Sequence, residues 1–200
     1  MRKAKFAFFM PVLVAAVFFA ASCNSIENQT ESASMLVVEN LLGTNMDGDE
    51  ANFLQSDVLY VDPTSLESSI FADSAVATMT ARLLNPASIS GPSQYNDITV
   101  DRYVVSYMRS DGQNVEGVDV PYSFEGYLNT VVSVDTTSSV SFVIVREVAK
   151  MEPPLLNLHG NRDVGVLQVH ARVDFYGHDT VGKNVTATGY LDIYFANYAN

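Results

Sequence analysis

The chain has 200 residues, with 11 lysines and arginines against 23 aspartates and glutamates, and its formal net charge is −12. The basic residues are few and do not cluster, so no patch is available to neutralise nucleic-acid phosphates, and we expect no nucleic-acid partner. The chain contains one cysteine. No intramolecular disulfide can form, and the fold must depend on its hydrophobic core.

Residues 1–22 have the pattern of an export signal. Three basic residues near the start are followed by an apolar run over residues 6–19 and by small residues at 20–22. The order of a charged region, an apolar region and a small-residue cleavage site is typical of a signal peptide. The apolar run is shorter than the roughly 20 residues of a membrane span and contains Pro11. We therefore expect residues 1–22 to be removed.

The only cysteine, Cys23, follows this leader directly. The segment Ala20-Ala21-Ser22-Cys23 resembles the lipobox of bacterial lipoproteins, and the resemblance implies that Cys23 is diacylated and becomes the new N-terminus. The alternative is ordinary cleavage, which would leave an exposed thiol in an oxidising compartment. With asparagine at position 24, the same resemblance implies that the lipoprotein is located in the outer membrane of a Gram-negative bacterium. Loss of the leader would take the charge from −12 to −15, so membrane contact would come from the N-terminal acyl chains.

The next two segments carry weaker patterns. Residues 23–33 are polar and without apolar periodicity, which predicts a lipidated tether with a reach of about 18 Å. Residues 34–70 contain "SMLVVENLL", which fits either a strand or one amphipathic turn, and "NFLQSDVLYVDP", which is typical of a short strand closed by Pro63. We expect this segment to be only partly ordered and to precede the folded domain.

From residue 71 onward, apolar and polar residues alternate in segments separated by Gly, Pro, Asn and Asp. In "GVLQVHARVDFYG" the odd positions 167–175 are apolar and the even positions are polar, which predicts a strand with one face in a core. "NVTATGYLDIYF" repeats this pattern, with its odd positions buried. The connector "GHDTVGKN" between them is suited to a hairpin loop.

Four more strands are predicted upstream. "SAVATMTARLLNP" is one, and "SSVSFVIVREVA" is another whose apolar residues occupy both faces, which suggests a central strand. In "DITVDRYVVSYMRSDG" the alternation slips, and a bulge is expected near Asp101 and Arg102. Pro121 in "VDVPYSFEGYL" indicates an edge strand. No long helix is expected after the leader.

Six or seven strands in about 130 residues predict an all-β fold, an antiparallel immunoglobulin-like β-sandwich over residues 71–200. The C-terminal part, "HARVDFYGHDTVGKNVTATGYLDIYF", resembles bacterial immunoglobulin-like domains, in which a strand ends in Asp, crosses a Gly-containing turn and returns as the last strand. The disulfide and the buried tryptophan of antibody domains are absent, since the chain has no Trp. A lipocalin-like barrel is the alternative.

Catalytic patterns are not found, and we predict that the protein is not an enzyme and needs no cofactor. His159, His170 and His178 lack the paired spacing of a zinc site. Asp97 and Asp101 share a strand face but lie roughly 13 Å apart, beyond glycosidase carboxylate separations. No serine lies in a G-x-S-x-G turn.

The segment "NMDGDE" offers oxygen ligands at Asn45, Asp47, Asp49 and Glu50, which is similar to a calcium loop. The glycine is misplaced, and Ser56 stands where an acidic residue would close the loop. An acidic loop without metal is the preferred interpretation.

These observations favour a non-enzymatic cell-envelope lipoprotein whose sandwich binds a protein partner or is an accessory subunit of a surface assembly. The loops around Tyr95, and around Tyr176 and His178, are the first candidates for contact if they cluster at one end. The alternative is a carrier of an apolar ligand between the sheets, in a cavity lined by residues such as Phe142, Val173 and Ile193.

Overall fold

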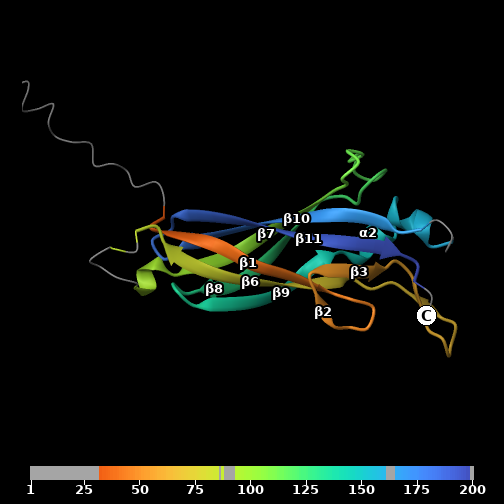
Figure 1. Ribbon diagram of the computed structural model, residues 1–200, viewed down its shortest axis with the longest axis horizontal. Coiled ribbons are helices and arrows are strands. Elements are labelled where there is room, and N and C mark those ends of the chain that lie inside the picture. The colour runs from red at the N-terminus through yellow and green to blue at the C-terminus, as the bar shows by residue number, and fades with distance from the viewer. Residues whose placement is uncertain (1–31, 86, 88–92, 161–164, 199–200) are drawn as a thin grey trace, which may run out of the picture. The chain divides into compact units, whose positions relative to one another are not determined.

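Two β-sheets make up most of the fold (Figure 1). The computed structural model describes residues 32–85, 87, 93–160 and 165–198; the predicted signal peptide, Cys23 and most of the predicted tether lie outside them. The four-stranded sheet has the order β2-β1-β6-β9 and is antiparallel. Its strands are β1 (Ser34–Thr44), β2 (Glu50–Ala51), β6 (Asp73–Leu83) and β9 (Thr137–Val145).

The second sheet has five strands in the order β3-β11-β10-β7-β8. They are β3 (Phe53–Asp57), β7 (Ile98–Met108), β8 (Phe124–Val132), β10 (Leu167–Asp179) and β11 (Asn184–Ala196). All pairs are antiparallel except β3 with β11, which is parallel. A further two-stranded ribbon joins β4 (Tyr60–Val61) to β5 (Ser68–Ser69).

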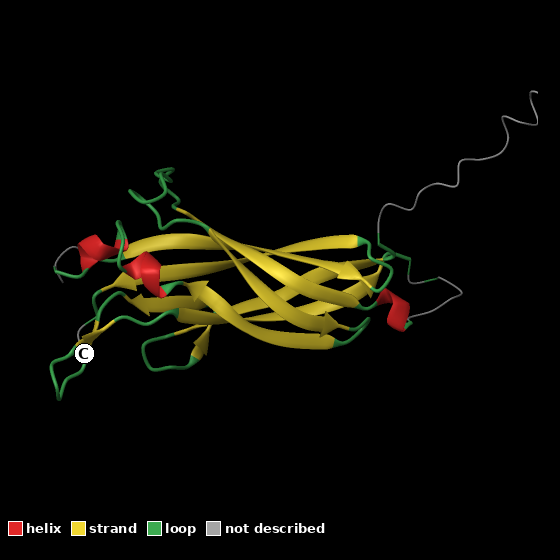
Figure 2. Ribbon diagram, turned by 180° about the vertical axis from the view of Figure 1, so that it is seen from behind, coloured by secondary structure: helices red, strands yellow, loops and turns green. Residues whose placement is uncertain are grey.

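Helical segments in the described residues are short and lie in connections between strands (Figure 2). They are η1 (Gln94–Asn96), α2 (Glu147–Lys150) and η2 (Leu155–Leu158). In this part of the chain no helix has the length and apolar character needed to cross a membrane.

The prediction of an all-β fold is confirmed. The strands form two separate sheets that share one hydrophobic core, and not the single closed sheet of the barrel alternative. Three aromatic rings join the sheets at the centre of this core. The centroid of the Phe142 ring on β9 lies 4.9 Å from that of Tyr103 on β7 and 5.4 Å from that of Phe175 on β10. Such edge-on contacts add to the stabilisation from burial alone.

Two tyrosine hydroxyls also connect the sheets. Tyr103 donates to the carbonyl oxygen of Val143 at 3.0 Å, and Tyr107 donates to that of Ile144 at 2.6 Å. Because both tyrosines lie on β7 and both carbonyls on β9, these bonds fix the last residues of β9 against the opposite sheet.

The prediction that the strand at 140–145 is central is wrong. Among the described strands, β9 pairs only with β6 and forms an edge of the four-stranded sheet. Its apolar residues on both faces have another cause. The end of β9 is covered by the facing sheet, where Phe142, Ile144 and Val145 are all buried.

The predicted facing of the last two strands is confirmed. Along β10 the odd positions from Val169 to Phe175 are fully buried, and along β11 Ile193 and Phe195 are fully buried. The two strands pair through twelve residues across the predicted hairpin. The bulge in β7 is also confirmed, because the register with β8 shifts between Val100 and Arg102. The edge position of β8 agrees with the prediction, although Pro121 precedes the strand.

The structure differs from the sequence prediction over residues 34–70. β1 pairs with β6 along its length, and β3 pairs with the last strand, so the fold includes residues that were expected to be partly ordered ahead of it. Leu54 and Val58 are buried in the shared core. Gly43 permits the close approach of β1 to β3, because a Cβ there would lie 2.7 Å from the Leu54 Cβ.

Candidate functional site

The side of the five-stranded sheet that faces away from the core carries large exposed side chains. We call it the outer face and define it by Arg102, Glu125, Tyr127, Arg172, Tyr176 and Tyr190. Strand alternation places them there, since each is next to a residue of β7, β8, β10 or β11 that is buried or, beside Tyr127, partly buried. Tyr127 and Tyr190 are 77% and 62% exposed, respectively.

One end of the outer face is a charged aromatic cluster. Arg102 forms an ion pair of 3.0 Å with Glu125, and its guanidinium lies 4.0 Å from the centroid of the Tyr176 ring. The Tyr127 hydroxyl and the Arg102 guanidinium lower the pKa of Glu125 below its ordinary value. Glu125 in turn raises the pKa of Tyr127. The cluster therefore keeps its charges at neutral pH and presents aromatic surface beside them.

A second group lies on the two central strands. Arg172 forms an ion pair of 3.0 Å with Asp174, and Thr188 donates to the same carboxylate at 2.6 Å. Tyr190 stands opposite Arg172 in the strand register. Each arginine of the outer face is therefore paired with a carboxylate.

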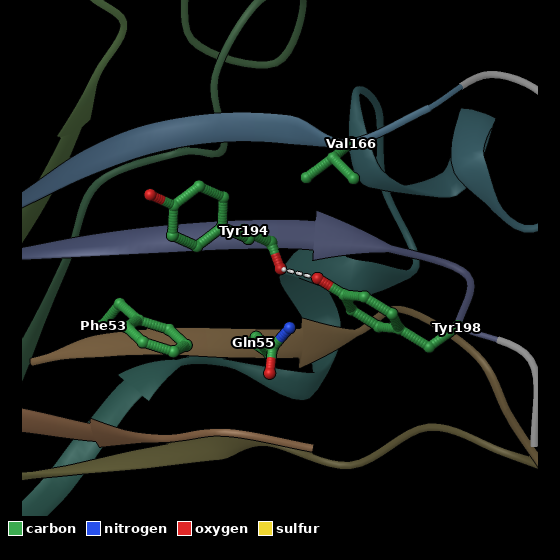
Figure 3. A pocket seen from close by; sticks show the side chains of 5 residues that line it. All are labelled: Phe53, Gln55, Val166, Tyr194 and Tyr198. Atoms are coloured by element: carbon green, nitrogen blue, oxygen red, sulfur yellow. Dashed lines mark hydrogen bonds between the residues drawn. The ribbon is translucent and has the colours of Figure 1, made fainter. Parts of the chain in front are cut away.

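A hollow of about 370 Å³ lies beside the ends of β3 and β11 (Figure 3). It is lined by Phe53 and Gln55 of β3, Tyr194 of β11, and Val166 and Tyr198 from the neighbouring segments. All five side chains retain solvent exposure, so the hollow is open. Phe53 and Gln55 belong to the same side of the sheet as Tyr194, because Gln55 and Tyr194 are register partners.

The walls of the hollow are held by bonds within the protein. The Tyr198 hydroxyl donates to the carbonyl oxygen of Tyr194 at 3.1 Å, as Figure 3 shows. The Gln55 side-chain oxygen accepts from the Met46 N–H at 3.0 Å. Phe53 meets the Tyr194 ring edge-on, with 5.9 Å between centroids. The hollow is therefore formed before any ligand arrives.

Ser56, Asp73 and Lys150 form a polar cluster that the sequence did not suggest. Lys150 pairs with Asp73 at 2.9 Å and donates to the carbonyl oxygen of Asp57 at 2.8 Å, while Ser56 donates to Asp73 at 2.6 Å. Burial raises the pKa of Asp73, and the charge of Lys150 opposes this effect. Ser56 and Lys150 are 0% and 1% exposed, so no substrate can reach them. The cluster fastens α2 to β3 and β6.

Two of the three histidines lie on β10, eight residues apart in the sequence, and the third lies in a connection. His170 is on β10 and contacts Asp192 across the strand pair, His178 is near the end of β10, and His159 follows η2. Within the described ranges, no group of three or more His, Cys, Asp or Glu side chains is arranged to hold a metal ion.

The "NMDGDE" segment forms the connection between β1 and β2. The side-chain oxygen of Asn45 accepts the Asp49 N–H at 2.8 Å, and Gly48 adopts a positive φ of 85°. Asn45 therefore acts as a turn residue here, while Asp47 and Glu50 are exposed. The carboxylate of Asp97 accepts from Ser133 at 3.0 Å and from the Val134 N–H at 3.2 Å, whereas Asp101 is exposed at the bulge.

The two loops singled out from the sequence do meet at one end. Thr180 donates to the carbonyl oxygen of Gln94 at 2.9 Å, which ties the loop of Tyr95 to the loop after His178. We call this the Ser32 end, because the described chain begins there and Ser32 bonds to the Asp179 carboxylate. The hollow lies at the other end of β11.

Sequence reasoning missed the hollow because its residues come from three distant segments. One signal was available: Tyr190, Asp192 and Tyr194 alternate with the buried residues of "GYLDIYF" and therefore share the outer side of β11. Nothing local connects them to Phe53 or Gln55.

No protein-family model matches this chain, and no curated protein matches it at a significant level.

Proposed function

We propose that this protein is a non-enzymatic cell-envelope lipoprotein, anchored by acyl chains on Cys23 in the outer membrane of a Gram-negative bacterium. Its immunoglobulin-like β-sandwich binds a protein partner, or joins a larger surface assembly, through the outer face. The observation that carries the binding role is the set of exposed tyrosines and arginines on the outer face. The lipobox-like segment before Cys23 supports the anchor.

The strand order supports the immunoglobulin-like assignment. In that fold one sheet contains strands A, B and E, and the other contains C, C′, F and G. Here β1, β6 and β9 correspond to strands A, B and E. In the other sheet, β7, β8, β10 and β11 correspond to strands C, C′, F and G, and the chain order is the same.

The composition of the outer face supports recognition of a protein. Tyrosine and arginine are enriched among the residues that dominate binding energy at protein interfaces. Tyrosine offers large contact area with few rotatable bonds, and arginine offers several hydrogen-bond donors in a planar group. Tyr127 and Tyr190 are well exposed on a rigid sheet, and the nearby carboxylates hold both arginines in place. The loops at the Ser32 end are less suitable, because they lie where the folded chain joins the predicted tether.

The alternative role, transport of an apolar ligand between the sheets, requires a cavity lined by Phe142, Val173 and Ile193. All three side chains are buried in the shared core cluster, and the hollow described above is lined by other residues. The packing therefore favours a surface-binding role.

The anchor is tested by Cys23→Ser. We expect this variant to lose labelling by palmitate and to leave the membrane fraction, while the folded domain keeps its melting temperature. Ser25→Ala is the matched control, because it changes a neighbouring hydroxyl outside the lipobox. Continued acylation of Cys23→Ser would exclude Cys23 as the anchor.

Partner binding is tested by cross-linking in intact envelopes. We expect the wild-type protein to capture a reproducible partner, and expect Tyr127→Ala and Tyr190→Ala each to lower capture by about tenfold or more, as for interface residues that dominate binding. Val181→Ala is the control, since Val181 is 70% exposed in the β10–β11 turn and outside the outer face. Equal capture by all variants, at unchanged melting temperature, would reject the outer face as the binding surface.

A further inference from the structure

We propose that the hollow formed by Phe53, Gln55, Val166, Tyr194 and Tyr198 binds a neutral sugar ring, such as one pyranose unit of a glycan. This site is separate from the outer-face residues assigned to the protein partner. The inference uses the chemistry of the five lining side chains and does not depend on how the protein is anchored.

The size and openness of the hollow fit one ring of an extended ligand. Its volume of about 370 Å³ lies near the lower limit of small-molecule sites, which begin at about 300 Å³. Because all five side chains remain partly exposed, a bound ring can continue into solvent as a longer chain. An enclosed pocket would not allow this.

The apolar part of the lining matches the carbon face of a sugar ring. Phe53, Tyr194 and Tyr198 supply aromatic surface, and Val166 adds an aliphatic contact. A pyranose presents C–H groups on one face and hydroxyl groups around its edge. Tyrosine is suited to such a ligand, because its ring contacts the apolar face while its hydroxyl reaches a polar group.

The polar part of the lining is neutral. Gln55 contributes an amide, and the two tyrosines contribute hydroxyl groups. No charged side chain is among the five. Two carboxylates lie near these residues: Asp57 accepts the Tyr198 N–H at 3.2 Å, and Asp192 is the register partner of Phe53. This environment does not favour an anionic ligand, and amides and hydroxyls are the groups that exchange hydrogen bonds with sugar hydroxyls.

The hollow is also preformed, which lowers the cost of binding. The bonds from the Tyr198 hydroxyl to the Tyr194 carbonyl and from the Met46 N–H to the Gln55 side chain hold two walls in place. Side chains that are already ordered lose little conformational freedom when a ligand binds. A hydrocarbon chain would fit less well, because the open hollow would leave it in water beside an amide and two hydroxyls.

The experiment uses neutral oligosaccharides as probes: maltohexaose, cellohexaose, xylohexaose and mannohexaose, each titrated into the protein by calorimetry. We expect at least one probe to bind the wild-type protein saturably. Tyr194→Ala and Phe53→Ala should weaken that binding by about tenfold or more, the loss expected when an aromatic contact is removed. Tyr194→Leu, which keeps side-chain bulk, should weaken it similarly.

Tyr190→Ala is the matched control, because Tyr190 lies four residues away on the same strand and the same side but outside the hollow. It should bind the probe within about twofold of wild type, although we expect it to lose partner capture. The proposal is overturned if none of the four probes binds the wild-type protein, if Tyr194→Leu and Phe53→Ala leave binding unchanged, or if Tyr190→Ala weakens it equally.

Discussion

Asp179 closes the β10–β11 hairpin through its side chain. One carboxylate oxygen accepts the N–H groups of Val181 and Lys183 at 3.0 and 2.8 Å. Burial alone would raise the pKa of Asp179, but the bonds from Lys183, Ser32 and Val181 together hold it below its ordinary value. A carboxylate with a lowered pKa stabilises the folded state only while it is ionised.

We therefore expect Asp179→Ala to lower the free energy of unfolding at pH 7 by about 1–3 kcal/mol, because two partly buried N–H donors lose a charged acceptor. Asp179→Asn keeps one acceptor oxygen and should lose less. The contribution of Asp179 is complete above its unfolded pKa of about 4 and disappears as the pH falls through the lower folded value. Urea unfolding from pH 7 to pH 2 measures this. Parallel pH profiles for wild type and Asp179→Asn would contradict the assigned role.

At the scale of elements, the sequence predicts best where strand alternation is strict. β10 and β11 keep one apolar face without interruption, so both their facing and their hairpin are predicted correctly. The bulge at Asp101 is visible as a slip in the same alternation. On the neighbouring strand β10, Gly177 lies opposite the bulge. A side chain would not fit at this position, because a Cβ there would lie 2.3 Å from the Thr99 carbonyl oxygen.

β1 and β3 were not assigned to the folded domain, and the reasons differ. The register of β1 shifts between Val38 and Asn40, which breaks its alternation into two short parts. β3 has five residues, and its partner β11 is more than 130 residues away in the chain. Such parallel, long-range pairing leaves no local pattern. The position of β9 was predicted wrongly because its apolar character comes from the opposite sheet and not from strands on both sides.

The outer face and the hollow also differ in how far the sequence predicts them. The outward side chains of β10 and β11, including Tyr190, could be assigned from alternation alone. The hollow could not, because it depends on β3 meeting β11 and on Val166 and Tyr198 closing the same space. Its chemistry is therefore a property of the tertiary structure, whereas Cys23 and its lipobox-like context are readable only in the sequence.

For the whole molecule, the first strands determine where the folded domain begins. Leu36, Leu41, Leu54 and Val58 all contribute buried side chains to the shared core. Burial of side chains of this size stabilises by about 1.5–3 kcal/mol each, and a domain of this kind is stable by only about 5–15 kcal/mol in total. Loss of the four together would remove most or all of that stability.

The corresponding prediction compares two fragments, residues 32–200 and residues 71–200. The longer fragment should unfold cooperatively in urea, because it contains both complete sheets. The shorter fragment lacks β1, which pairs with β6, and β3, which pairs with β11. It also lacks the Ser56 hydroxyl, which binds Asp73, and the Asp57 carbonyl, which binds Lys150. We expect it to show no cooperative transition and to expose apolar surface. A cooperative transition of residues 71–200 near the urea midpoint of the longer fragment would mean that residues 34–70 are an addition to the domain and not part of it.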